Sequence, residues 1–130
     1  MKAEFNPGFR LAVTDVLVLI IGTLGSVVAG QLEWWYGFTI AFTVAHFFLF
    51  CNVFRISRSL ELIWAVAFTG LAFLTATVYL PAWPLTITLS LLVTVAVISI
   101  EMKSPRYHGV GWERINPGLR IWWDQKMDVN

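Results

Sequence analysis

Residues 11–30 read LAVTDVLVLIIGTLGSVVAG, an apolar stretch whose only charged residue is Asp15. An α-helix needs about 20 apolar residues to cross the hydrocarbon core of a bilayer. Three further stretches of similar character follow at residues 36–54, 60–80 and 85–102. Helices are the expected form, because lipid cannot satisfy open backbone groups and the stretches lack the alternation of barrel strands. The sequence therefore predicts an all-α membrane protein with four transmembrane helices.

Composition agrees with this prediction. The 130 residues are 58% hydrophobic and only 13% charged, with a mean hydropathy of +0.71, whereas a soluble domain carries about 25% charged residues. The net charge of +1 gives no indication of nucleic-acid binding. Cys51 is the only cysteine, which excludes an intramolecular disulfide and a cysteine metal cluster. Within an apolar stretch, it is expected to be a small buried hydrophobic residue.

Short connections join the four stretches, at residues 31–35, 55–58 and 81–84. Connections of this length make successive helices pack as antiparallel hairpins, so we expect a four-helix bundle made of two hairpins. Residues 1–102 are the expected transmembrane domain, and residues 103–130 are the expected tail. The first stretch is expected to be retained, because it is longer than the roughly 7–15 apolar residues of a cleaved signal peptide.

The basic residues give these helices an orientation. Basic residues gather on the cytoplasmic side of membrane proteins. Here all nine lysines and arginines precede the first stretch, lie between the second and third, or follow the fourth. We therefore expect a multi-pass protein of the cell (inner) membrane with both termini in the cytoplasm. The nine residues are Lys2, Arg10, Arg55, Arg58, Lys103, Arg106, Arg114, Arg120 and Lys126.

An Asn-Pro-Gly sequence occurs twice, at residues 6–8 and 116–118. Asparagine caps free N–H groups and proline suits the first helical position, so both copies are expected to start helices. The second would open an amphipathic helix over residues 117–127. We expect this helix to lie at the membrane interface, either anchoring the tail or forming a docking surface for a partner. Its expected interface anchors are Trp112, Trp122 and Trp123.

Polar residues gather at the cytoplasmic ends of the predicted helices. Asp15 lies inside its span, where an ionisable group is costly and needs a partner on another helix. Arg55 is the expected partner, and Asn52 shares the face of Arg55 and could complete the site. Two interpretations remain open, a structural clamp and a binding site for a ligand, an ion or a lipid headgroup. The predicted cluster comprises Asp15, Asn52, Arg55, Arg58, Glu61 and Glu101.

His46 is predicted to lie deeper, near the middle of the bilayer. One interpretation is a neutral histidine that is hydrogen-bonded to a hydroxyl group on a neighbouring helix. The other is a haem or metal ligand. Because His108 is in the tail, a second histidine ligand for haem would have to come from another copy or another subunit.

Small and hydroxylated residues predict where helices approach one another. Gly22, Ser26 and Gly30 recur every fourth position of the first stretch, which is typical of close helix packing in membranes. A second stripe in the fourth stretch consists of Thr86, Ser90 and Thr94. These stripes are expected to mediate packing, either within the bundle or between copies.

No catalytic motif accompanies these features. The sequence has no glycine-rich phosphate loop, no H-E-x-x-H and no G-x-S-x-G. We therefore expect no enzyme activity and no cofactor. The leading hypothesis is an accessory or assembly subunit, or an oligomeric scaffold, of a membrane complex, with the bilayer and other membrane subunits or further copies as partners. The alternatives are a small transporter or ion- or lipid-binding protein, and haem or metal binding through His46.

Overall fold

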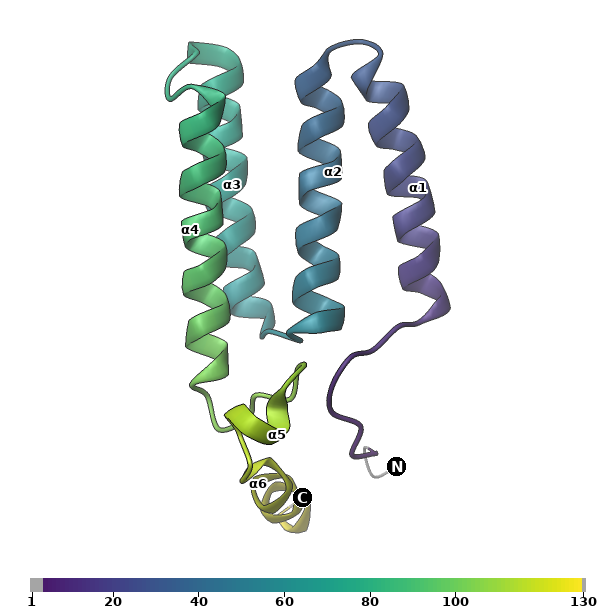
Figure 1. The fold of residues 1–130 in the computed structure, drawn as a ribbon, viewed down its shortest axis with the longest axis vertical. Helices are drawn as coiled ribbons and strands as arrows, with labels where there is room; N and C mark the ends of the chain where they lie inside the picture. Colours follow the sequence, from purple (N-terminus) through teal and green to yellow (C-terminus); the bar gives the residue numbers. More distant parts are fainter. Residues whose placement is uncertain (1–3, 130) are drawn as a thin grey trace.

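The computed structural model describes residues 4–129 as a chain of helices, with no strand among these residues. Its four long helices are α1 (Val13–Gly30), α2 (Trp34–Phe48), α3 (Arg58–Val78) and α4 (Trp83–Met102). They stand side by side along the long axis of the molecule (Figure 1). All four are long and apolar enough to cross a membrane, once α2 is taken together with the turn that follows it. The prediction of an all-helical membrane protein is confirmed at this level.

The second span ends in a wider helical turn. α2 continues into a π-helical segment, η1 (Leu49–Val53), in which the Phe54 N–H donates to the Leu49 carbonyl at 2.9 Å. The next residue, Arg55, has a φ of 49°, an unusual left-handed conformation for a residue with a side chain. Together these features end the helix abruptly and turn the chain toward α3.

Two pairs of helices pack most closely, α1 with α2 and α3 with α4, while α2 meets α3 over a smaller contact. Between α1 and α2 the backbones nearly touch at Gly37, and the Ser26 hydroxyl donates to the Gly37 carbonyl at 2.6 Å. Small residues permit this approach. The remaining space between α2, α3 and α4 is filled by buried aromatic and aliphatic side chains, among them Phe50, Trp64 and Phe68.

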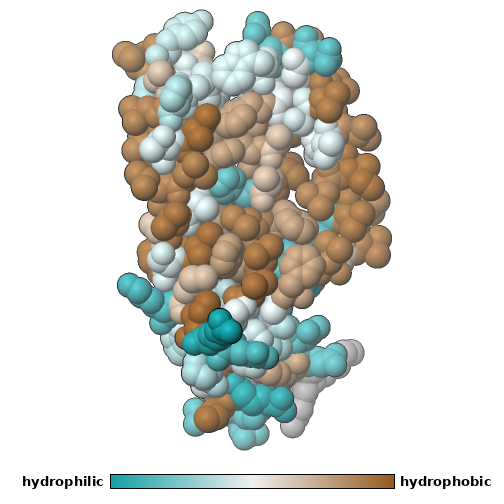
Figure 2. All heavy atoms as spheres, in the orientation of Figure 1, coloured by the Kyte–Doolittle hydropathy of each residue, from teal (hydrophilic) through white to brown (hydrophobic). Residues whose placement is uncertain are grey.

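The outer surface of the helices is apolar. α1 has no buried residue, and large side chains such as Ile21 and Val28 are more than 60% exposed, at 68% and 67%. Figure 2 shows hydrophobic side chains over the helices, a large hydrophilic surface at the end where the N-terminal segment and the tail lie, and a smaller one at the opposite end. An exposed apolar surface of this extent requires lipid or another protein to cover it.

The N-terminal segment and the tail come together beyond one end of the four helices (Figure 1). Residues 4–12 run in extended form toward the tail, where the Gly8 N–H donates to the His108 carbonyl at 2.7 Å. The tail contains the short helices α5 (Trp112–Ile115) and α6 (Leu119–Asp128). We call residues 4–12 and 103–129 together the terminal cap.

The first Asn-Pro-Gly copy does not start a helix, contrary to our prediction. α1 begins only at Val13, after Ala12 in extended conformation. The segment before it is drawn away from the helix by its hydrogen bonds to the tail, and Gly8 adopts a φ of 97° that glycine tolerates.

Candidate functional site

Asn52 joins the start of α1 to the end of the second span. Its Nδ2 group donates to Asp15 Oδ2 and to the Arg10 carbonyl, both at 2.7 Å, and its own carbonyl accepts the Arg10 N–H at 3.1 Å. Asp15 Oδ2 also accepts the Ala12 N–H at 2.7 Å. The side chain of Asp15 therefore accepts one hydrogen bond at the first turn of α1 and another from η1.

The expected pairing of Asp15 with Arg55 is not formed. Arg55 follows the π-helical turn and its left-handed backbone directs it elsewhere, so that its Nη1 group donates to the Asn6 carbonyl at 2.6 Å. The neutral amide of Asn52 takes the place that the prediction gave to the guanidinium group. The i+3 spacing of these residues assumed a regular α-helix, which η1 is not.

Glu61 is almost wholly buried and is the centre of a second group. Its carboxylate accepts hydrogen bonds from Arg58 Nη1 at 3.0 Å and from the Cys51 thiol at 3.4 Å. Cys51 is exposed on the helix surface, contrary to the expectation that it is buried. The difference arises because η1 shifts the register of the last turn of this span.

Glu101 is the centre of a third group, at the end of α4. It is 2% exposed and accepts hydrogen bonds from the Ser57 N–H and Arg106 Nε, both at 3.3 Å. The structure thus divides the predicted cluster into three local groups, around Asp15, Glu61 and Glu101. Each group links different segments of the chain or the two ends of one turn.

The terminal cap is packed against the loop after η1. The Val110 N–H donates to the Val53 carbonyl at 2.9 Å, and the Gly109 backbone lies so close to Phe54 that an added Cβ would collide with it. Tyr107 is buried and donates to the Val110 carbonyl at 2.6 Å. Burial, with a further contribution from the charge of Glu101, raises the pKa of this tyrosine.

Two of the three predicted interface anchors take part in this packing. Trp112 and Trp123 both contact Phe5 edge-on, at ring-centroid distances of 5.8 and 5.7 Å. Trp122 instead lies beneath the ammonium group of Lys126. Phe5 of the N-terminal segment therefore packs against both tail helices, a contact that no sequence pattern indicated.

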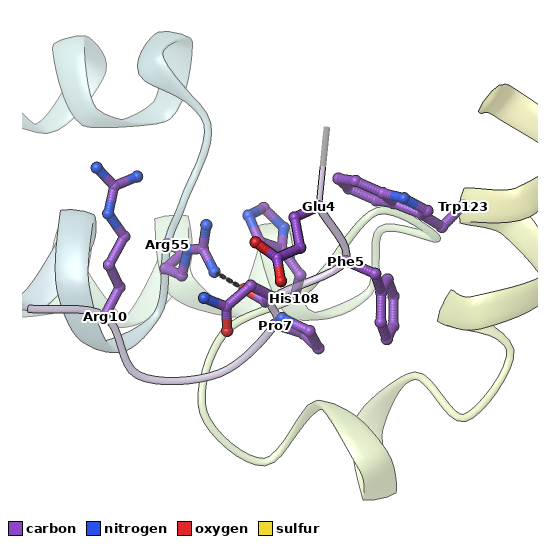
Figure 3. A pocket seen from close by; sticks show the side chains of 8 residues that line it. Glu4, Phe5, Pro7, Arg10, Arg55, His108 and Trp123 are labelled. Atoms are coloured by element: carbon purple, nitrogen blue, oxygen red, sulfur yellow. Dashed lines mark hydrogen bonds between the residues drawn. The ribbon is translucent and has the colours of Figure 1, made fainter. Parts of the chain in front are cut away.

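A cavity of about 280 Å³ lies inside the terminal cap (Figure 3). Its lining comes from the N-terminal segment, the loop after η1 and the tail. Arg55 was predicted as a site residue, but Arg10 and His108 were not, since nothing in the sequence shows that residues so far apart meet. The lining residues are Glu4, Phe5, Asn6, Pro7, Arg10, Arg55, His108 and Trp123.

His46 is stacked on the indole ring of Trp64, with ring centroids 4.4 Å apart and planes inclined by 13°. Its Nδ1 group donates to the Phe42 carbonyl of its own helix at 2.8 Å. The expected hydrogen bond to a hydroxyl on another helix is not formed among residues 4–129. The nearby Thr94 hydroxyl instead accepts from Trp64 Nε1 at 2.8 Å and donates to the Ser90 carbonyl. Within residues 4–129 no three His, Cys, Asp or Glu side chains are grouped to hold a metal ion.

Both packing stripes contact a neighbouring helix of the same chain. Thr86, Ser90 and Thr94 are buried, and Thr86 shares a hydrogen bond of 2.5 Å with Thr75 of α3. In the other stripe, Ser26 and Gly30 of α1 pack against Gly37 of α2, and Gly22 faces Val44.

Comparisons with protein-family models, curated proteins and solved structures found no match to this chain.

Proposed function

We propose that the protein is a non-catalytic, multi-pass protein of the cell (inner) membrane. In this proposal both termini are cytoplasmic, and the protein serves as an accessory or assembly subunit, or an oligomeric scaffold, of a membrane complex. The orientation is supported by the distribution of basic residues: those among residues 4–129 all belong to segments at the terminal-cap end of the four long helices.

The main support for the proposal is that the acidic residues accept hydrogen bonds from other parts of the chain. Asp15 and Glu101 each accept hydrogen bonds from a different segment of the chain, and Glu61 accepts them from Arg58 and Cys51. A group that carries a proton or cation must exchange its partners, whereas these carboxylates hold the helix ends and the terminal cap together. Their geometry favours a structural clamp over a transport site.

The exposed surface of α1 gives further support. Of the other long helices, only α2 makes substantial contact with α1, and none of the residues of α1 is buried. A helix held along one face leaves the others available to lipid or to another membrane subunit.

Purification in a mild detergent tests the proposal. We expect a homo-oligomer, or a complex that retains another membrane protein, when mass is measured by light scattering and native mass spectrometry. A lone monomer that retains no protein partner after in-cell crosslinking would contradict the proposal. Asp15→Asn, measured in the same preparation, separates the two roles: a transport site predicts lost transport with unchanged stability, and a clamp predicts lower stability.

A further inference from the structure

The cavity at the terminal cap is lined by two arginines that form no ion pair with a carboxylate among residues 4–129. Among residues 4–129, Arg58, Arg106 and Arg120 form ion pairs with carboxylates. Arg10 and Arg55, which both line the cavity, form none in that part of the chain. Two guanidinium groups beside one cavity repel each other, so an anion between them would be stabilised.

Arg55 is fixed in this position by the fold. Its backbone takes the left-handed conformation, and one Nη1 hydrogen bond of 2.6 Å goes to the Asn6 carbonyl, a neutral acceptor. A guanidinium group has five N–H donors, so most remain for a ligand. Burial, and then the neighbouring charge of Arg10, lower the pKa of Arg55. Unusual backbone conformations of this kind recur at binding sites.

We infer that this cavity binds a phosphate group, with Arg10 and Arg55 as the guanidinium donors. Guanidinium groups match phosphate oxygens in geometry and give short, charge-assisted hydrogen bonds. A cavity of about 280 Å³ admits a phosphate group with part of the molecule attached to it. Trp123 and Phe5 provide apolar walls for that attached part (Figure 3).

Glu4 gives the inference a sharp internal test. It lines the same cavity and forms no ion pair with either arginine in residues 4–129. Its carboxylate repels a bound anion. Removing that charge should therefore strengthen phosphate binding, whereas a general loss of structure would weaken it.

The position of the cavity indicates two sources from which such a phosphate group could come. Arg10 precedes α1 and Arg55 follows η1, so both lie at the inner ends of spans. In the proposed orientation, on which this step alone rests, that is the level of the anionic headgroups of the cytoplasmic leaflet. The phosphate is then either that of an anionic phospholipid or a free phosphate in the cytoplasm.

Binding is measured with the full chain in detergent. Titration calorimetry with inorganic phosphate addresses the free anion, and native mass spectrometry with phosphatidylglycerol, against phosphatidylcholine, addresses the lipid. Arg10→Gln and Arg55→Gln should each weaken binding about tenfold or more, since each removes charge-assisted hydrogen bonds. Glu4→Gln should bind more tightly. Arg114→Gln is the matched control, because it removes an exposed positive charge of the tail that does not line the cavity.

Either probe supports the inference if its binding follows this order of variants, and the probe that binds identifies the source. Unfolding of each variant without phosphate separates lost binding from lost folding. The inference is overturned if neither probe binds, or if Arg114→Gln weakens binding as much as Arg10→Gln. A lone monomer in the purification experiment would contradict the proposed function and leave this measurement unaffected.

Discussion

Asn52 connects η1 to residues 10–15, which lie far from it in the sequence. Its side-chain amide donates to Asp15 and to the Arg10 carbonyl, and its backbone carbonyl accepts from Arg10. The residue is 3% exposed, so these polar groups have no ready substitute partner. A buried polar group that loses its partner costs more than the net energy of the hydrogen bond itself.

Replacing Asn52 with alanine should lower the free energy of unfolding by about 1–3 kcal/mol. The variant leaves Asp15 without its hydrogen-bond donor on the other helix. Adding Asp15→Ala to it should therefore lower the free energy of unfolding by less than Asp15→Ala does in the parent chain. Denaturant titration of the purified protein in mild detergent measures both. Thr23→Val is the control, because the Thr23 hydroxyl bonds only to Leu19 of its own helix. If Asn52→Ala and Thr23→Val lowered the free energy of unfolding equally, the clamp formed by Asn52 and Asp15 would be contradicted.

His108 is expected to couple the docking of the tail to pH, because its pKa is lowered where the tail is docked. Burial is the largest cause that lowers the pKa of His108 below its ordinary value of 6.5, and the charge of Arg55 adds to it, while the Arg106 carbonyl and Glu101 act in the opposite sense. Glu4 and Arg10 line the same cavity. The docked tail thus favours neutral His108, and the undocked tail takes up its proton first as the pH falls.

Docking of residues 103–129 should therefore be strongest above pH 6.5 and weaken as the pH falls from 6.5 toward the lowered pKa. Limited proteolysis of the tail in phosphate-free buffer measures this, with faster cleavage expected at the acidic end. His108→Gln, which stays neutral, should cleave at a rate that changes less with pH. Cleavage that slows on acidification would contradict the assignment.

At the scale of helices, hydropathy was enough to find the four spans, because the bilayer itself imposes their length and composition. The π-helical turn η1 and the left-handed Arg55 could not be found this way. Both depend on hydrogen bonds from Arg10 and Val110, which lie far away in the sequence. The members of the polar cluster, and the pairing of Arg58 with Glu61 three residues later, could be recognised from the sequence. The distant partners of Arg55 and Glu101 could not.

The contact between α1 and α2 at Gly37 leaves no room for a methyl group. A Cβ at Gly37 would lie 2.6 Å from the Ser26 carbonyl oxygen and 2.9 Å from Gly30 Cα. Gly37→Ala should force α1 and α2 apart and cost about 1–3 kcal/mol of stability. Gly25→Ala is the matched control on α1, where a Cβ would have no neighbour within 4 Å, and should be at least as stable as the parent. Equal stability of the two variants would show that the helices do not meet at Gly37.

At the scale of the whole molecule, the N-terminal segment and the tail lie at one end of four apolar helices, and the larger hydrophilic surface lies there too (Figure 2). The terminal cap, the clamp and the proposed phosphate cavity all lie there. The opposite end consists of the turns at Gln31 and Pro81, flanked by aromatic residues. In the proposed orientation the terminal-cap end faces the cytoplasm, so the position of this end relative to the membrane is the central prediction.

Cysteine accessibility in intact cells tests this claim most directly. In a Cys51→Ser background, a single cysteine is placed at Leu32, which is 77% exposed in the α1–α2 turn, or at Gly118, where a Cβ meets nothing within 4 Å. A membrane-impermeant maleimide should label Leu32→Cys in intact cells and Gly118→Cys only after permeabilisation. Labelling of Gly118→Cys in intact cells, with Leu32→Cys protected, would contradict the account.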